Sequence, residues 1–321
     1  MALRVAVLDL GTNTFNLVIA EQNSSDSFHI LHSSKMPVKL GESGINHGEI
    51  IPAAFQRGIA AIDKHYRTIK RLKADKIFAF GTSALRSSKR GELFISTIKK
   101  NTGIKVEIIS GDREAELIYY GVRQTIQMTE QRYLILDIGG GSNELIIANK
   151  DKIYWKRSYD LGIARLLEKF KPSDPITPAE ISLIKTYFKE EIPDLIDAAT
   201  KFGVKTLLGA SGSFETFEAM LRADEEDFES ETALRAKSVE ITRKNFELLY
   251  ERLINSTKKE RQQMRGLEPM RIEMIVLACL FVKFIIEKLE IETIIQSNFS
   301  LKEGVIYQLI KNKDHEQDFS N

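Results

Sequence analysis

The chain lacks several residue types that mark particular classes of protein. It has one cysteine among 321 residues, Cys279, which excludes an internal disulfide and fits a reducing compartment. Its five histidines are scattered and follow no metal-ligand spacing, and no serine–histidine–acid pattern is present. A P-loop lysine motif is also missing. We therefore expect a cytoplasmic protein that uses neither a histidine-bound metal nor a serine–histidine nucleophile.

Charge of one sign and long apolar runs are equally scarce. Lysine and arginine number 46, and aspartate and glutamate number 45, so no overall field draws nucleic acid or an anionic membrane to the protein. The most apolar segment, residues 274–282, is too short to span a bilayer. The first residues lead straight into an apolar strand, so we expect no signal peptide. What remains is a soluble globular composition with enough length for two domains.

A stretch near the start of the chain recurs in altered form. Residues 4–20 and 132–148 align at one constant offset. The aligned pairs are Asp9 with Asp137, Gly11 with Gly139, and Thr14 with Ser142. Each copy has the pattern of an apolar strand, an acidic residue, a turn of small polar residues and a second apolar strand. Two copies of one unit indicate two domains of common origin.

The two turns have the composition of anion-binding loops. Glycine lets a backbone approach closely and tolerates positive φ, and successive N–H groups that point into a concavity bind phosphate. A third turn of small residues, 210–213, follows a predicted strand. The predicted phosphate-binding residues are Gly11, Thr12, Asn13, Thr14, Gly139, Gly140, Gly141, Ser142, Asn143, Gly209, Ser211 and Gly212. We expect the first two turns to hold a chain of phosphates from both sides.

Acidic residues accompany these two turns. Asp9 and Asp137 each follow an apolar strand, at the end where ligands of open α/β sheets bind. A carboxylate beside phosphate is repelled unless a cation lies between them, so the sequence predicts Mg²⁺. A single aspartate of this kind is more often a turn residue, but its repetition favours a functional role. The second copy has Glu144 where the first has Asn16, which we interpret as a feature of a site that activates water.

Two further residues occupy candidate positions. Glu114 opens a helix after residues 110–111, where the helix dipole alone is an equally good explanation for a carboxylate. Asp112 and Glu116 are competing candidates. Arg86 follows a strand and a Thr-Ser turn and offers phosphate a fork of donors, although a lone arginine is more often a surface residue. From the residues alone, these choices stay open.

Strands and helices alternate through both halves, as an α/β protein requires. Capping boxes predict that helices start after Thr177 and Ser300, and Pro193 and Gly203 predict a helix interruption and a helix end. Periodicity predicts helices over 52–72, 242–254 and 269–289, strands over 28–39, 76–81, 106–110, 204–209 and 293–296, an exposed acidic loop over 224–231 and frayed residues over 313–321.

Taken together, these segments resemble the exopolyphosphatase/guanosine pentaphosphate phosphatase (Ppx/GppA) family over nearly the whole chain. The motifs that carry the resemblance are DLGTNT from Asp9, KLG from Lys39, GTSALR from Gly81, ISGDREA from Ile109, DIGGGSNE from Asp137, LGIAR from Leu161 and LGASGS from Leu208. The resemblance implies an α/β fold of two related actin-like ATPase (ribonuclease H-like) domains flanking an interdomain cleft. It implies a first domain over 1–125, to which a last helix over 300–313 returns, and a second domain over 126–299.

The same resemblance implies roles for individual residues. Glu114 corresponds to the family's catalytic glutamate, in preference to Asp112 and Glu116. Asp137 and Glu144 correspond to the acidic pair of the second turn, and Arg86 corresponds to the arginine that faces phosphate. The expected metal ligands for Mg²⁺ are Asp137, Glu144 and Asp9.

The implied reaction is the release of terminal phosphate from inorganic polyphosphate by Mg-assisted attack of water, or of the 5′ γ-phosphate from pppGpp. Longer family members carry C-terminal helical domains before which this chain stops, which favours a shorter polymer or a homodimer. The family often has RAD and GLREG where this chain has RIE at 271–273 and SLKEG at 300–304, and these two departures bear on substrate choice. It also often has Thr where this chain has Asn143. The alternatives are a kinase or ATPase of the same superfold and a regulator that binds pppGpp or ppGpp with little turnover.

Overall fold

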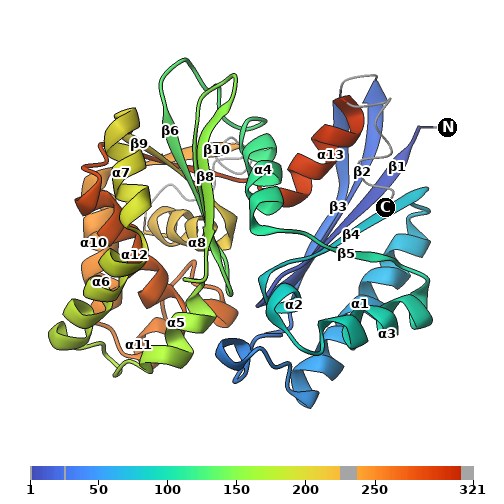
Figure 1. Cartoon of the computed structure of the whole chain (residues 1–321), viewed down its shortest axis with the longest axis horizontal. Helices are drawn as coiled ribbons and strands as arrows, with labels where there is room; N and C mark the ends of the chain where they lie inside the picture. The colour runs from blue at the N-terminus through green and yellow to red at the C-terminus, as the bar shows by residue number, and fades with distance from the viewer. Residues whose placement is uncertain (1, 25–26, 225–236, 312–321) are drawn as a thin grey trace. The chain divides into compact units, whose positions relative to one another are not determined.

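The computed structural model describes residues 2–24, 27–224 and 237–311, which form two compact units (Figure 1). Unit 1 comprises Met1–Gly121, Gly139–Gly141 and Ser300–Asn321. Unit 2 comprises Val122–Ile138 and Ser142–Phe299. The chain therefore leaves unit 1 after Gly121 and rejoins it at Ser300, and the short glycine turn Gly139–Gly141 groups with unit 1.

The sheet of unit 1 contains the first copy of the repeat. Its strands are β1 (Arg4–Leu10), β2 (Thr14–Ser24), β3 (Ser27–Pro37), β4 (Lys76–Gly81) and β5 (Val106–Ile108). They lie in the order β3-β2-β1-β4-β5, with β1 antiparallel to β2 and parallel to β4. Val7, Leu8 and Leu10 are fully buried. Because both faces of β1 are covered, its sequence is a nearly continuous apolar run rather than an alternating one.

Helices cover this sheet and confirm the predicted α/β alternation. They are α1 (Pro52–Arg71), α2 (Ser83–Ser87), α3 (Gly91–Thr102), α4 (Gly111–Val122) and α13 (Leu301–Lys311), with a 3-10 turn η1 (Ile45–His47). In α1, Pro52 occupies the first turn and Ile62 and Ile69 are buried, as predicted for a helix over 52–72. The start of α13 is also confirmed, because the Ser300 N–H donates to Glu303 Oε2 at 2.9 Å.

Unit 2 repeats the same strand arrangement around the second copy. Its strands are β6 (Tyr133–Ile138), β7 (Asn143–Ala148), β8 (Ile153–Tyr159), β9 (Thr206–Ala210), β10 (Ser238–Ile241) and β11 (Thr293–Ser297). Their order is β10-β11-β9-β6-β7-β8, with β6 antiparallel to β7 and parallel to β9. The set β6, β7 and β9 thus matches β1, β2 and β4. This correspondence in topology supports the common origin inferred from the sequence repeat.

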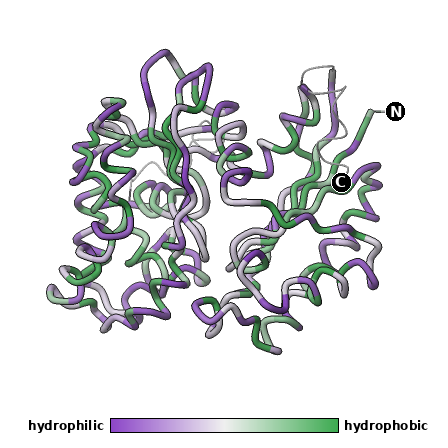
Figure 2. Tube along the Cα trace, in the orientation of Figure 1, coloured by the Kyte–Doolittle hydropathy of each residue, from purple (hydrophilic) through white to green (hydrophobic). Residues whose placement is uncertain are grey.

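One long apolar helix forms the centre of the unit 2 core. The helices and 3-10 turn of this unit are α5 (Ile163–Phe170), α6 (Pro178–Glu191), α7 (Pro193–Phe202), α8 (Ser211–Arg222), α10 (Arg243–Ile254), α11 (Lys258–Arg261), η2 (Pro269–Arg271) and α12 (Ile275–Lys288). Nearly every side chain from Ile275 to Ile286 is buried, including Cys279, as expected of a core helix. Figure 2 shows hydrophobic residues concentrated along the strands and alternating with hydrophilic ones along outer helices.

Local signals in unit 2 are confirmed where they rest on capping chemistry. Thr177 and Glu180 form a reciprocal capping box at the start of α6. Pro193 begins α7 directly after α6 ends, and Gly203 ends α7 in a left-handed conformation with φ of 62°. These devices use backbone N–H and C=O groups that a helix end leaves without partners, so a short sequence is enough to recognise them.

Other expectations need correction. Residues 210–213 were expected to form a loop, but α8 begins at Ser211. The helix predicted over 269–289 begins only at Ile275, after the 3-10 turn η2. Residues 225–231 of the predicted acidic loop and the predicted frayed end over 313–321 lie outside the described residues. The short elements β10 and α11 were not predicted, although Thr257 and Glu260 form a capping box at the start of α11.

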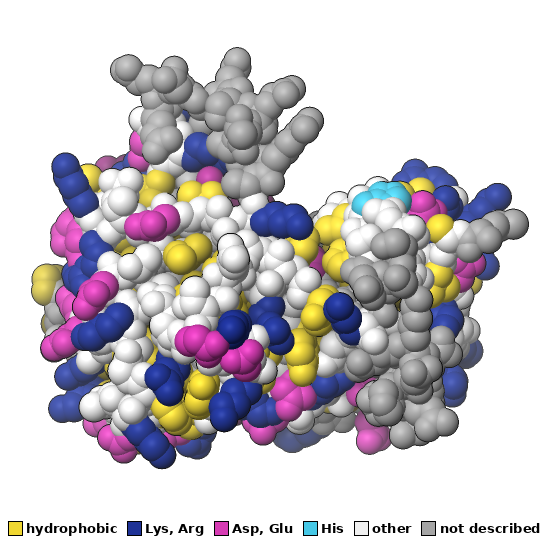
Figure 3. Space-filling model, turned by 90° about the horizontal axis from the view of Figure 1, so that it is seen from above, with side chains coloured by type: hydrophobic (Ala, Val, Ile, Leu, Met, Phe, Trp, Pro, Cys, Tyr) yellow, Lys and Arg dark blue, Asp and Glu magenta, His cyan; other side chains and the backbone are white. Residues whose placement is uncertain are grey.

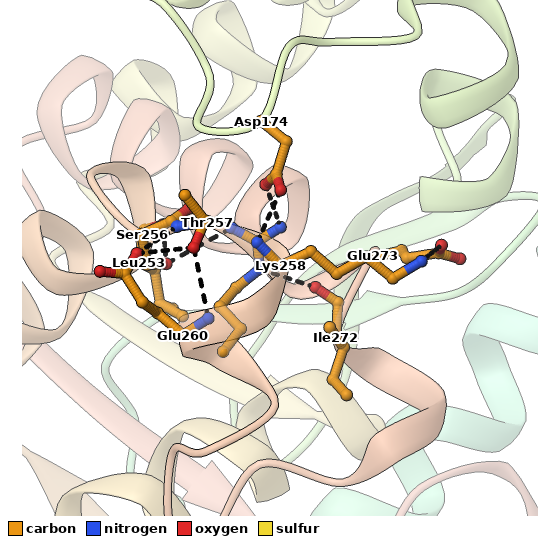
Figure 4. A network of polar contacts seen from close by, with 9 residues as sticks. Asp174, Leu253, Ser256, Thr257, Lys258, Glu260, Ile272 and Glu273 are labelled. Carbon is orange, nitrogen blue, oxygen red and sulfur yellow. Dashed lines mark hydrogen bonds and ion pairs between the residues drawn. The ribbon is translucent and has the colours of Figure 1, made fainter.

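A buried arginine fixes the irregular segment between α10 and α12 (Figure 4). Arg261 Nε donates to the Ile272 carbonyl at 2.9 Å, and its Nη1 donates to the Ser256 carbonyl. Its Nη2 lies 2.7 Å from Asp174 Oδ1, and the Lys258 N–H donates to Asp174 Oδ2 at 2.7 Å. One guanidinium thus satisfies carbonyl groups that lack a helix or sheet partner. The network holds the loop around Asp174 against the segment that leads into α12.

The distribution of surface charge and the length of the apolar helices complete the description of the fold. Figure 3 shows lysine and arginine side chains interspersed with aspartate and glutamate on the face it presents, without one dominant sign. Among the described helices, none combines the length and apolarity that a membrane span requires.

Candidate active site

The two copies of the repeat fold into equivalent hairpins with the same register. In β1–β2, Asp9 stands opposite Asn16, and in β6–β7, Asp137 stands opposite Glu144. Residues directly opposite in an antiparallel pair project to the same face of the sheet and lie close together. The partner of each aspartate is therefore the residue seven positions later in the chain. The partner is an amide in the first copy and a carboxylate in the second.

The first turn is held in place by its own backbone and by the segment that follows β3. The Gly11 N–H donates to the Thr14 carbonyl at 3.1 Å, so this amide is engaged within the turn. The Asn13 carbonyl accepts from the N–H groups of Val38 and Lys39, both at 2.9 Å. The KLG motif thus has a physical role in bracing the first turn.

The glycines of the two turns allow neighbouring atoms to approach closely, and they do not adopt positive φ angles. None of Gly11, Gly139, Gly140 and Gly141 has a positive φ. A Cβ added to Gly141 would lie 2.5 Å from Ser83 Oγ and 2.6 Å from Thr12 Oγ1, two residues of the same unit. Such distances are sterically forbidden, so the turn depends on glycine for space.

Two buried hydroxyl groups lie beside this turn in unit 1. Thr12 and Ser83 are each 3% exposed. Within the described ranges, neither Thr12 Oγ1 nor Ser83 Oγ has a hydrogen-bond partner. A buried hydroxyl without a partner costs free energy, and native proteins keep few of them outside functional sites. Sequence reasoning included Thr12 but missed Ser83, whose only signal was its place in the GTSALR motif.

In the second copy, two carboxylates face each other across the hairpin. Asp137 is 8% exposed and Glu144 is 1% exposed. Glu144 Oε1 accepts a hydrogen bond of 2.7 Å from Ser158 Oγ on β8. Like charges directly opposite one another destabilise a sheet unless a cation or hydrogen bonds compensate. In the first copy, Asn16 Nδ2 instead donates to Asp9 Oδ2 at 2.9 Å.

The second pair fits a divalent cation better than the first does. No cluster of three or more histidine, cysteine, aspartate or glutamate residues suited to a metal occurs in residues 2–24, 27–224 and 237–311. Mg²⁺ does not require such a cage, because it commonly binds through one or two carboxylates, substrate phosphates and retained waters. Asp137 and Glu144 supply this number of carboxylates, whereas Asp9 already accepts from the Asn16 amide.

Glu114 and Arg86 form an ion pair within unit 1. Arg86 Nη1 donates to Glu114 Oε2 at 3.1 Å and to the Ile109 carbonyl at 2.9 Å. Glu114 is only 8% exposed. Ser110 Oγ accepts from the Arg113 N–H, so a hydroxyl caps α4 and the helix does not depend on Glu114 for this. The competing Glu116 pairs with Arg113, 3.2 Å away.

The helix that carries Glu114 is braced by the last helix of unit 1. Arg113 Nη2 on α4 donates to Gln308 Oε1 on α13 at 2.8 Å. A Cβ on Gly304 would lie 1.8 Å from the Leu117 carbonyl, so the backbones of α13 and α4 meet directly. This contact fixes α4, and with it the position of Glu114.

The third turn, in unit 2, is more constrained than its sequence indicated. Ser211 has a φ of 71°, and its Oγ bridges the backbone N–H and carbonyl of Ile138 at 3.3 and 3.2 Å. A Cβ on Gly209 would lie 2.1 Å from the Phe214 ring, which gives this glycine a packing role. A Cβ on Gly212 would lie 1.6 Å from Arg271 Nη2. The guanidinium of Arg271, not among the predicted site residues, therefore covers the first turn of α8.

Asn143 also has a structural task. Its side chain is fully buried, and its Nδ2 donates to the Leu161 carbonyl at 2.9 Å. This bond ties the second turn to the LGIAR motif that leads into α5. The amide side chain faces Leu161, so any contribution of Asn143 to phosphate binding falls to its backbone.

A protein-family comparison matches the Ppx/GppA phosphatase family over residues 18–313. The chain belongs to this family. The resemblance seen in the sequence motifs is thereby confirmed, and so is the fold class of two related actin-like ATPase α/β domains, because the similar solved structures are Ppx/GppA proteins.

Named relatives include both activities of the family. The chain is 27% identical to a guanosine-5′-triphosphate,3′-diphosphate pyrophosphatase of Photobacterium profundum, covering 97% of this chain but 60% of that protein. It is 26% identical to a putative exopolyphosphatase of Haemophilus influenzae, covering 96% of this chain and 92% of that protein. The chain thus spans less than two thirds of the first relative and nearly all of the second.

Solved structures give the same assignment of fold. An exopolyphosphatase from Cytophaga hutchinsonii is 34% identical, with a TM-score of 0.92 over 96% of this chain and 98% of that one. An Aquifex aeolicus PPX-GPPA enzyme is 24% identical with a TM-score of 0.78, over 96% of this chain and all of that one, and supports the fold alone.

Proposed function

We propose that this protein is an exopolyphosphatase that releases the terminal phosphate of inorganic polyphosphate. The observation that carries the proposal is Glu114, a nearly buried carboxylate that is not needed as a helix cap and is held by Arg86. A structural ion pair explains the contact with Arg86 but gives no reason for burying the carboxylate almost completely. Both the contact and the burial are explained if Glu114 is the base that takes a proton from water and Arg86 is the cation that binds phosphate.

The chemistry assigned to these residues is a single displacement. Glu114 accepts a proton from water as the water oxygen bonds to the terminal phosphorus. The bridging P–O bond breaks, and the shortened chain leaves with its negative charge. Arg86 offers N–H donors to the non-bridging oxygens, whose charge changes during transfer. We propose that the hydroxyl groups of Thr12 and Ser83, which lack a hydrogen-bond partner among the described residues, also donate to phosphate oxygens.

We propose Mg²⁺ as the cofactor, with Asp137 and Glu144 as its protein ligands. When bound, Mg²⁺ would reduce the charge on the phosphates and so weaken their repulsion of water. Asp9 would take part less directly, because it is engaged with Asn16. Ser158 would orient Glu144 toward the cation, as a hydrogen-bonded neighbour of a metal ligand ordinarily does.

The extent of similarity favours polyphosphate over pppGpp as substrate. The relatives named exopolyphosphatase are matched over 92% and 98% of their length, whereas the pppGpp-type relative is matched over 60%. Hydrolysis of pppGpp to ppGpp remains the second candidate, because that relative covers nearly all of this chain. We further propose that the reaction takes place in the cytoplasm, where a lone buried Cys279 stays reduced.

The test is phosphate release from polyphosphate and from pppGpp, with and without Mg²⁺, by the wild type and two variants. Glu114→Gln keeps the size of the side chain and removes the base, so we expect a loss of about 10²–10⁴-fold. Glu116→Gln is the matched control two residues along the same helix, and it should retain near-normal turnover.

Equal turnover by Glu114→Gln and Glu116→Gln would remove Glu114 from the mechanism. A wild type that hydrolyses pppGpp much faster than polyphosphate would replace the first candidate with the second. ATP-dependent phosphorylation of an acceptor, without phosphate release from either compound, would contradict both and favour a kinase.

A further inference from the structure

A groove runs along α6 in unit 2, beside the C-terminal end of α12, and no residue assigned above lies in it. Figure 1 shows the two helices next to each other, and their residues are in contact. The groove has a volume of about 530 Å³, within the range of ordinary ligand sites. Its charged lining residues are Lys185, Lys189, Glu287 and Lys288. The groove is therefore net cationic, in a protein whose overall charge is only +1.

The one acidic residue of the groove is already neutralised. Lys185 Nζ lies 2.8 Å from Glu287 Oε2, and Lys283 Nζ lies 3.2 Å from Glu287 Oε1. Although burial opposes it, these lysines lower the pKa of Glu287, so its carboxylate stays ionised and occupied. Glu287 thus sets the position of Lys185 and offers little repulsion to an incoming anion.

The two remaining lysines have no counter-ion of this kind. Lys189 and Lys288 are exposed, and no ion pair to either is found in the described parts of the chain. Each occupies the last turn of its helix, where the macrodipole favours a cation. The helix dipole explains why each helix has a lysine in its last turn. It does not explain why Lys189 and Lys288 line the same groove as Lys185.

The shape of the groove favours a linear ligand. Its lining extends along α6 from Pro178 to Lys189, which is about 16 Å at the rise of an α-helix. Ser182, exposed on the same wall, adds a hydroxyl donor. Phe284 at the floor is only 4% exposed, so it presents no open ring face for a nucleobase. Charge repeated along the ligand is thus the feature that the groove can recognise.

We propose that this groove binds inorganic polyphosphate at a second point on the protein, through Lys185, Lys189 and Lys288. The proposal rests on the proposed function for the identity of the polyanion, but on none of the catalytic residues. A second anchor retains a long substrate between successive cleavages, because the tethered chain stays at high local concentration. It gives no advantage for a substrate too short to reach it.

The test compares two charge-matched double variants in the Glu114→Gln background, so that the polymer is not consumed. Lys189→Gln with Lys288→Gln removes two charges from the groove. Lys244→Gln with Lys259→Gln removes two exposed lysines elsewhere in unit 2. Affinity for medium-chain inorganic polyphosphate, measured by fluorescence competition at several salt concentrations, should fall about three- to tenfold in the groove variant alone. The slope of log affinity against log salt concentration should also become shallower, by the equivalent of roughly one to two ion pairs.

Three results would overturn the proposal. Equal affinity in the two double variants would show that the groove lysines contribute no more than any others. If the groove variant lost as much affinity for tripolyphosphate as for medium-chain polyphosphate, the lysines would act at the catalytic site. If it lost as much affinity for pppGpp, the groove would be a nucleotide site. A wild type that released no phosphate would defeat the proposed function, while the affinity difference would still decide the groove.

Discussion

The two copies of the repeat have the same fold and differ in one decisive partner. Asp9 is matched by the Asn16 amide, which donates to it at 2.9 Å, whereas Asp137 is matched by the Glu144 carboxylate. The first arrangement is complete in itself, because an amide satisfies the carboxylate. The second places two buried carboxylates on one face of the sheet, an arrangement that a bound cation would stabilise. One position thus distinguishes the two copies, and we propose that it makes the second copy the one that binds a cation.

The other features of each copy follow this difference. The first turn is braced by backbone hydrogen bonds from residues 38–41 and by the buried His65, whose Nε2 lies 3.1 Å from the Phe15 carbonyl. The second hairpin has Ser158, which donates to Glu144. The contacts around the first copy therefore fix its backbone, whereas the contact with Ser158 orients the charged side chain of Glu144.

The largest expected effect comes from giving the second copy the partner of the first. Glu144→Asn should form the same amide–carboxylate pair with Asp137 and leave the fold intact. Because a cation ligand is lost, phosphate release should fall by about 100-fold or more. The measurement is steady-state phosphate release over a range of Mg²⁺ concentrations. Activity within a few fold of wild type at saturating Mg²⁺ would mean that Glu144 is not a ligand.

The reverse exchange should affect stability and add no function. Asn16→Glu removes the hydrogen bond to Asp9 and places two carboxylates opposite each other in β1–β2. The free energy of unfolding should fall by about 1–3 kcal/mol, as measured by urea denaturation. If added Mg²⁺ restored the stability fully, the first copy would be able to hold a cation after all.

Removing the orienting hydroxyl of the second copy should have an intermediate effect. Ser158→Ala leaves Glu144 without its 2.7 Å donor. We expect roughly tenfold weaker apparent Mg²⁺ affinity and little change in the rate at saturating Mg²⁺, because the ligand itself remains. A lower saturated rate with unchanged Mg²⁺ dependence would assign Ser158 to catalysis instead.

The smallest effect concerns pH and the first copy. Burial lowers the pKa of His65 below its ordinary 6.5, the Phe15 carbonyl partly opposes this, and His32 adds to it. The unfolded chain therefore takes up a proton below pH 6.5 while the folded protein does not. Stability supplied by neutral His65 is present above pH 6.5 and is lost as pH falls, by at most about 1.4 kcal/mol per pH unit. Thermal unfolding between pH 7 and pH 5 should be less pH-dependent in His65→Gln, and an unchanged slope would contradict this.

The fold was largely predictable because its signals are local. The repeat, the apolar strands and the capping box at Thr177 each occupy a short stretch, and each appears in the structure as predicted. The helix start at Ser211 was missed because a Gly-Ser sequence after a strand is equally typical of a loop. Only the clamp between Ser211 Oγ and the backbone of Ile138 decides between the two, and that contact spans 73 residues.

The site was predictable in its residue types and less so in its partners. The residues alone left Glu114, Asp112 and Glu116 as competing candidates, and the structure adds that Glu114 pairs with Arg86 and that Ser110 caps its helix. Ser83, Ser158 and Arg271 were not among the predicted site residues, because serines and arginines occur throughout any chain and only motif membership set Ser83 and Arg271 apart. Their significance comes from what lies beside them, namely Gly141, Glu144 and Gly212.

The most direct test of the difference between the copies is Mg²⁺ binding itself. Calorimetric titration of Mg²⁺ in the presence of inorganic phosphate should give one site in the wild type and in Asp9→Asn. The same titration should give none in Asp137→Asn. Binding that is lost in Asp9→Asn and kept in Asp137→Asn would contradict the account, because the cation would then belong to the copy whose aspartate already accepts from Asn16.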